Sequence, residues 1–199
     1  MNELRRAALP YFGSCGLWAE ALRVGGFAFR SAEHYQRRTQ RNRCAIADGQ
    51  GRRVLSVPLA AGKHERCGVR EVRIHYAGDW PRRHFHTLRS AYGRAPFWPE
   101  YAGELADLYA RRPALLWDWN WGCVAWLRDQ LAPGLILAEA DNWQGGDDAR
   151  GYPLTPQPHL PPYPQVFSER HGWLSNLSAL DALLCQGPSA AGYLRAVPT

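Results

Sequence analysis

Apolar and polar residues follow two different periods along the chain, and the change of period predicts where strands give way to helices. A short apolar run at 7–12 and another at 27–30 indicate two strands. Between them, apolar residues with helical spacing predict a helix over 14–24, which Ser14 caps and Gly25 helps to end. The chain therefore opens with a strand–helix–strand pattern.

The next part of the chain predicts further strands joined by tight turns. The segment RNRCAIA (41–47) leads into the turn sequence DGQGRR (48–53), and the strand-like VLSVPL (54–59) follows it. Segment 69–76 alternates apolar and charged residues imperfectly, which favours one more strand. The region 27–76 is therefore expected to be rich in strands with hairpin-like connections.

The clearest helix signal lies at 79–96. Asp79 suits an N-cap and Pro81 suits the first turn. Residues spaced four apart form one stripe that is expected to face inward, namely Trp80, His84, Leu88 and Tyr92. The opposite side carries Arg82, His86 and Arg89.

Two more helices are expected at 99–112 and 113–131, followed by a late strand at 135–140. The segment 138–165 is rich in Gly, Pro and Asp and exceeds the usual length of a connection, and a short helix at 176–187 follows it. We expect one α/β domain over 1–199. Its mixed sheet would come mainly from the N-terminal half, and helices from the middle of the chain would pack against it.

Composition adds that the chain is globular and basic. Of the 199 residues, 46% are apolar and 21% charged, and the net charge is +6. Almost all of the basic residues are arginine, but they are spread along the chain rather than gathered in one patch. No apolar stretch is long enough to span a membrane and no export signal begins the chain, so we expect a cytoplasmic protein.

No pattern in the sequence indicates a cofactor or a metal. The dinucleotide-binding and P-loop glycine motifs are absent, and the five cysteines form no CxxC pair. Three aspartates in the Gly-rich segment, Asp141, Asp147 and Asp148, match no calcium loop. We therefore expect reduced thiols, no cofactor and no metal.

Two residues are candidates for acid–base chemistry. His84 lies on the inward stripe beside aromatic residues, where it is either a general base near neutral pH or a core histidine bonded to the backbone. Glu33 precedes a basic segment, and it is either the salt-bridge partner of that segment or a base for an incoming amine.

The basic segment 34–43 ends in Arg41, Asn42 and Arg43. If these residues begin a strand, Arg41 and Arg43 share one face about 7 Å apart and suit a phosphate or carboxylate. A structural salt bridge remains an alternative. Nucleic acid is the least favoured ligand, because only one aromatic residue interrupts the segment.

Hydroxyl-tipped aromatics and one amide suit a pocket for a sugar or a nucleotide, although each is also common in a core or at a rim. These candidates are Tyr11, Tyr92, Tyr163 and Gln165. Ser178 and Asp181 have the spacing of a capping box, which is favoured over a nucleophile because no G-x-S-x-G elbow surrounds the serine. Cys44 follows Arg43, but a buried strand thiol is favoured over a reactive one.

Several of these stretches, in this order, resemble the WbqC-like protein family. They are LPYF (9–12), YQRRTQRNRCAI (35–46), LSVPL (55–59), WPRRHFHTLRSAYGRAPFWPEY (80–101), YPQVF (163–167) and NLSALDALLCQGP (176–188). The resemblance matches His84 and the RNR triplet at 41–43 to the family pattern, which favours these positions over His86, Arg37 and Arg38.

The resemblance implies transfer of an acyl or aminoacyl group, of the glycine type, to an amino sugar of a bacterial surface polysaccharide such as O-antigen. His84 would act as the base. A sugar-nucleotide or acyl-donor substrate would contact Arg41, Arg43, Tyr11 and Tyr92. Two other functions stay open, a non-catalytic partner of a sugar-modifying enzyme and an RNA-binding protein. A homo-oligomer is also open.

Overall fold

The computed structural model describes residues 4–37, 39–60, 67–141 and 160–197. Its helices are α1 (Cys15–Val24), η2 (Val69–Glu71), α2 (Trp80–Tyr92), α3 (Trp98–Ala110), α4 (Leu116–Leu131), α5 (Ser168–His171), α6 (Ala179–Gln186) and α7 (Ser189–Arg195). Its strands are β1 (Arg5–Ala7), β2 (Gly26–Arg30), β3 (Arg43–Asp48), β4 (Gly51–Ser56) and β5 (Ile136–Ala140). The predicted mixed α/β fold class is confirmed.

A small parallel sheet joins two strands from near the N-terminus to a strand from beyond the middle of the chain. β2 lies between β1 and β5 and is buried along its whole length. Gly26 permits the close pairing with β5, because an added Cβ would lie 2.4 Å from the backbone oxygen of Ile136. The first predicted strand is displaced: β1 ends at Ala7, and the rest of the apolar run is buried without joining the sheet.

Strands β3 and β4 form a separate antiparallel hairpin. The two sheets thus replace the single mixed sheet that we expected, and β5 comes from the C-terminal half. The strand predicted at 69–76 is wrong. Val69–Glu71 is one turn of 3₁₀ helix, and Ile74 and Arg73 form isolated bridges to two different segments, so no continuous ladder forms.

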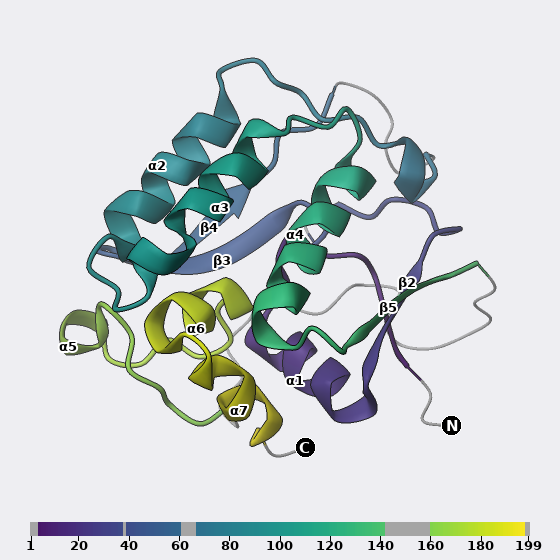
Figure 1. Cartoon of the computed structure of the whole chain (residues 1–199). Helices are drawn as coiled ribbons and strands as arrows, with labels where there is room; N and C mark the ends of the chain where they lie inside the picture. Colours follow the sequence, from purple (N-terminus) through teal and green to yellow (C-terminus); the bar gives the residue numbers. More distant parts are fainter. Residues whose placement is uncertain (1–3, 38, 61–66, 142–159, 198–199) are drawn as a thin grey trace.

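The helices divide the described molecule into two regions (Figure 1). α2 and α3 lie side by side with the β3–β4 hairpin next to them, whereas α6 and α7 lie near α1. One core connects these parts, and its largest fully buried side chains include Trp18, Trp80 and Trp119. No helix among the described residues has the length and apolarity needed to cross a bilayer.

The stripe predicted on α2 is confirmed: its four members are buried, and Arg82, His86 and Arg89 are exposed. The N-terminus of α2 differs from the prediction. Asp79 occupies the cap position with φ of 45°, but its side chain makes no cap bond. Instead, its carboxylate accepts a hydrogen bond of 2.8 Å from Arg112.

Candidate functional site

A cleft of about 640 Å³ lies where the C-terminal end of α2 meets the segment 164–167 and α6. Its volume falls in the range of small-molecule sites. The lining residues are Arg89, Ser90, Ala91, Gly93, Arg94, Pro96, Pro164, Gln165, Val166, Phe167 and Cys185. One wall is therefore polar and cationic, and the other is mostly apolar.

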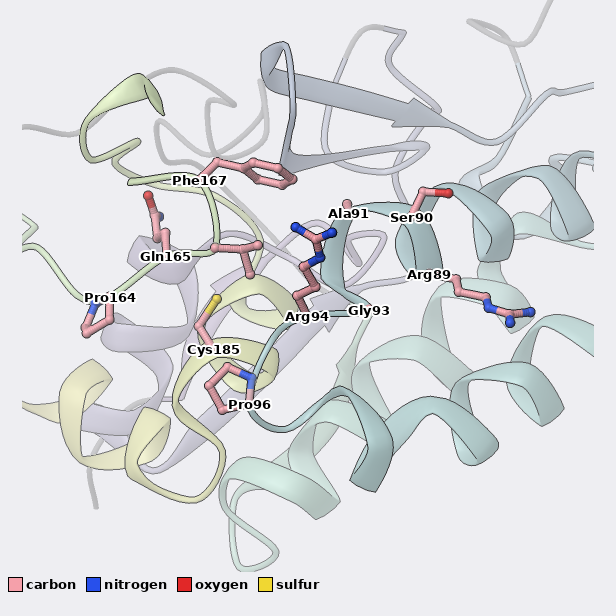
Figure 2. A pocket seen from close by; sticks show the side chains of 11 residues that line it. Arg89, Ser90, Ala91, Gly93, Arg94, Pro96, Pro164, Gln165, Phe167 and Cys185 are labelled. Atoms are coloured by element: carbon pink, nitrogen blue, oxygen red, sulfur yellow. The ribbon is translucent and has the colours of Figure 1, made fainter. Parts of the chain in front are cut away.

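The charge of the cleft comes from Arg89 and Arg94, and its lining contains no acidic residue. Figure 2 shows Arg94 extending toward Phe167, whereas Arg89 points away from it. Within the described part of the chain, Arg94 has no hydrogen-bond or ion-pair partner. A guanidinium without a protein partner offers its full set of donors to an anion.

Gln165 forms part of the wall opposite Arg94 and is held in one orientation. Its Nε2 donates to the Leu174 carbonyl at 3.0 Å and to the Asp181 carboxylate at 3.4 Å, and its Oε1 accepts from the Leu174 N–H at 2.9 Å. Both amide hydrogens are thus used. Gln165 can therefore only accept a hydrogen bond from a ligand in the cleft, through the second lone pair of Oε1.

Behind Gln165 lies a carboxylate that is fully buried. Asp181 accepts hydrogen bonds from the Tyr92 hydroxyl at 2.6 Å and the Tyr163 hydroxyl at 2.5 Å. Burial raises the pKa of Asp181, and these hydrogen bonds and the charge of Arg52 oppose the rise. Three predicted pocket residues, Tyr92, Tyr163 and Gln165, are thus brought together around one acid, but only Gln165 lines the cleft.

The sequence placed Asp181 in a capping box, and half of that prediction is confirmed. The Ser178 hydroxyl accepts a hydrogen bond from the Leu180 N–H and so caps α6. Asp181 turns inward to the tyrosines instead. A local pattern does not reveal this orientation, because Tyr92 is 89 residues away in the chain.

His84 lies apart from the cleft lining, in an aromatic cluster with Trp80 and Tyr109. It is 9% exposed. Nδ1 of the ring shares a hydrogen bond of 3.1 Å with the Tyr11 hydroxyl, and the Ser56 backbone raises the pKa of His84. Nδ1 is therefore engaged within the protein, and Tyr11 is fully buried beside it.

The surroundings of His84 keep it neutral near pH 7. Burial, reinforced by the charge of Arg83, lowers its pKa from 6.5 to about 4. A neutral imidazole is in the protonation state that a base requires, but a pKa this low makes it a weak one. The role of His84 as the general base stays a prediction.

The basic segment does not form the strand that we expected at Arg41. β3 begins at Arg43, and Arg41 lies before it with only 1% of its surface exposed. Arg41 donates to Glu33 at 3.0 and 2.5 Å, and Glu33 also lies 3.2 Å from Nε of Arg30. Glu33 and Arg41 thus form a buried ion pair in which each charge already has a partner.

Asn42 and Arg43 are half-buried at the start of the hairpin. Asn42 donates to the Val57 carbonyl at 3.2 Å. The Nε of Arg43 and the Oδ1 of Asn42 have no hydrogen-bond partner among the described residues. Of the predicted clamp, these two residues are the ones that retain unused polar atoms.

The thiols and acids give no sign of nucleophile or metal chemistry in the described part of the chain. Burial raises the pKa of Cys44 to about 12, and burial also raises that of Cys185 in the cleft. No group of three His, Cys, Asp or Glu side chains within 4–37, 39–60, 67–141 and 160–197 is placed to hold a metal. Asp141 accepts from the Ser31 hydroxyl, while Asp147 and Asp148 lie outside the described residues.

Comparison with known proteins assigns the chain to one family. Residues 9–144 match the WbqC-like protein family, and the chain therefore belongs to it. No curated protein and no solved structure matches the chain. The match covers the α2 wall of the cleft, whereas the wall at 164–167 and Cys185 lie beyond it.

Proposed function

We propose that this protein binds a negatively charged sugar derivative in the cleft and takes part in transferring an acyl or aminoacyl group to an amino sugar of a bacterial surface polysaccharide. The observation that carries the binding part is Arg94, a cation without a protein partner among the described residues, in a cleft whose lining has no acid. The acyl-transfer part is what the resemblance to the WbqC-like family implies, and membership of that family supports it.

The cleft offers a separate contact for each part of such a ligand. Arg94 suits a phosphate, because a guanidinium donates to two phosphate oxygens at once. A sugar hydroxyl suits Oε1 of Gln165, which only accepts, and the hydroxyl of Ser90. The apolar wall at Val166 and Phe167 suits the carbon-rich faces of a sugar or a base.

In the transfer itself, the amine of the sugar attacks the carbonyl carbon of an activated donor such as an acyl thioester. An amide bond forms, the thiolate leaves, and the amine loses a proton that restores the thiol. A base is needed for that proton. The family pattern favours His84, but His84 lies outside the cleft lining, so this role requires that the amine reach it from the cleft. Such donors and nucleotide sugars are cytoplasmic metabolites, so we expect the protein to act in the cytoplasm.

Binding is tested by thermal denaturation with uridine-diphosphate amino sugars, coenzyme A thioesters and a short RNA. A ligand at about 100 times its Kd adds about 2.7 kcal/mol to stability. We expect a nucleotide sugar to stabilise the wild type and to lose this effect in Arg94→Ala. Arg195→Ala, at an exposed position on α7, serves as the matched control. Equal stabilisation of wild type and Arg94→Ala would contradict the proposal.

One observation favours a second candidate, a non-catalytic partner of a sugar-modifying enzyme. The titratable groups that line the cleft are two arginines and the Cys185 thiol, whose pKa is raised by burial. None of them is suited to take a proton near pH 7. Mass spectrometry of the sugar after incubation with donor separates the two functions, because binding without acylated product supports the partner role.

A further inference from the structure

The exposed sides of α2 and α3 carry opposite charges. Every charged residue of α2 is basic, and Arg82, His86 and Arg89 follow one another at helical spacing on its exposed side. Every charged residue of α3 is acidic, and Glu100, Glu104 and Asp107 have the same spacing on its exposed side. We call these sets the basic stripe and the acidic stripe.

The two stripes do not neutralise each other within the chain. Among the described residues, no ion pair joins α2 to α3, and Arg82, Arg89, Glu100 and Asp107 have no hydrogen-bond or ion-pair partner for their side chains. Glu104 differs, since it accepts from Trp126 and Gln130 on α4. Two cations and two carboxylates therefore remain available on neighbouring helices.

The heights of the two stripes match. α2 and α3 lie side by side (Figure 1) and are joined by the short segment 93–97, so they run in opposite directions. The Phe85 ring, in the middle of α2, lies 6.0 Å from the ring of Trp98 at the start of α3 and 6.2 Å from the ring of Tyr109 near its end, so it packs between the two ends of α3. The rise per residue gives the distance of each side chain from the connection along its helix. Arg89 and Glu100 lie at similar distances from the connection, and so do Arg82 and Asp107.

We propose that the α2–α3 face is an interface between two copies of this chain. A two-fold axis that runs between the helices and parallel to them places α2 of one copy over α3 of the other without changing any height. Arg82 of each copy then lies opposite Asp107 of the other copy. Both pairs of opposite charges occur twice, because such an interface repeats every contact.

This geometry favours a second copy over an anionic polymer or a membrane. An anionic surface would be attracted to the basic stripe but repelled by the acidic stripe beside it. The acidic side of α3 also carries Gly103, where an added Cβ would meet no atom within 4 Å, so the backbone of another helix has room to approach.

The interface is expected to be weak. The two helices of each copy, each about 20 Å by 10 Å, together present about 400 Å², whereas a stable interface buries about 800 Å² per partner. Its attraction is mainly electrostatic, so it depends on salt. The dimer should therefore form at high protein concentration and low salt and dissociate as salt rises.

Sedimentation equilibrium of the full chain tests this interface at about 10 mM and about 1 M salt, where the Debye lengths are about 30 Å and about 3 Å. We expect dimers only at low salt. Arg82→Glu introduces two repulsive contacts in place of two attractive ones, so the dimer Kd should rise about 30-fold. Asp107→Arg should do the same.

Charge exchange is the decisive experiment, because it asks whether these two positions meet. The double variant Arg82→Glu/Asp107→Arg should dimerise like the wild type, and a mixture of the two single variants should form mixed dimers. Arg23→Glu changes an exposed charge on α1 and should leave the dimer intact. Circular dichroism confirms that each variant is folded.

Three results would overturn the inference. The first is a wild type that stays monomeric at low salt up to about millimolar concentration, the affinity range of the weakest interfaces. The second is a pair of single variants that dimerise as well as the wild type, which would assign the dimer to another face. A monomer that binds heparin through Arg82 would assign the basic stripe to an anionic polymer.

Discussion

Replacing His84 with glutamine should make the protein less sensitive to acid. In the wild type, burial lowers the pKa of His84 to about 4 from its ordinary value of 6.5. The unfolded chain therefore binds a proton between these two values that the folded chain does not, and stability falls as the pH falls. Glutamine cannot take up this proton, so the variant lacks this part of the pH dependence.

The size of the effect follows from the two pKa values. One pKa unit corresponds to about 1.4 kcal/mol. The His84 contribution lowers the free energy of unfolding by about 2 kcal/mol at pH 5 and by about 3 kcal/mol at pH 4, relative to pH 8. Glutamine also keeps a polar group beside the Tyr11 hydroxyl, because its amide can either donate or accept the hydrogen bond that His84 makes there.

Urea denaturation of both proteins between about pH 8 and pH 4 measures this difference. Carboxylates elsewhere titrate in both proteins, so their effect cancels in the comparison. His86→Gln, on the exposed side of the same helix, is the matched control and should follow the wild type. If wild type and His84→Gln lose stability in parallel, then His84 takes up its proton in the folded state, and the reasoning about its burial is refuted.

Three further predictions concern single side chains elsewhere in the fold. Glu33→Ala leaves the buried Arg41 without this partner and should lower the free energy of unfolding, measured by urea denaturation, by about 3 kcal/mol. A variant as stable as the wild type would show that Arg41 finds another partner. Gly187→Ala puts a side chain at φ of 57° and within 2.4 Å of an aromatic ring, so it should lower the free energy of unfolding by about 2 kcal/mol or more. Gly192→Ala is the control, because its added Cβ enters open space and should not destabilise the protein. Maleimide should label Cys67 first in the native protein, because the other four thiols are buried. Mass spectrometry locates the label, and early labelling of any of those four thiols would contradict their burial.

The sequence predicted α1, α2, α3, α4 and α6 because their apolar residues recur with a helical period, whereas α5 and α7 were not predicted. On α2, the buried residues and the exposed basic residues are those that the spacing indicated. The strand at 69–76 was predicted wrongly because imperfect alternation does not distinguish a ladder from isolated bridges. Val72 and Ile74 are buried there, but Ile74 bridges to Leu59 whereas its neighbour Arg73 bridges to Leu115.

The candidate site was harder to predict because its parts are distant in the sequence. Residue type and resemblance identified Tyr92, Tyr163 and Gln165, but not the acid that joins them. Asp181 had a sufficient local explanation as a capping residue, and only the fold brings two tyrosine hydroxyls to its carboxylate. Arg94 was missed for a similar reason, since a single arginine after a helix becomes significant only when the wall at 164–167 closes the cleft beside it.

The distribution of arginines shows why net charge alone does not locate a binding surface. Arg41, in the most basic stretch of the sequence, is buried and neutralised by Glu33. The arginines without a hydrogen-bond or ion-pair partner in the described part of the chain include Arg82, Arg89 and Arg94, which lie on or just after α2 in a less conspicuous segment. A buried ion pair mainly avoids the cost of an unpaired charge, whereas an exposed cation keeps its charge available for a ligand or a second copy. The basic stretch therefore contributes to the fold, and the cations of α2 are the ones that we expect binding experiments to detect.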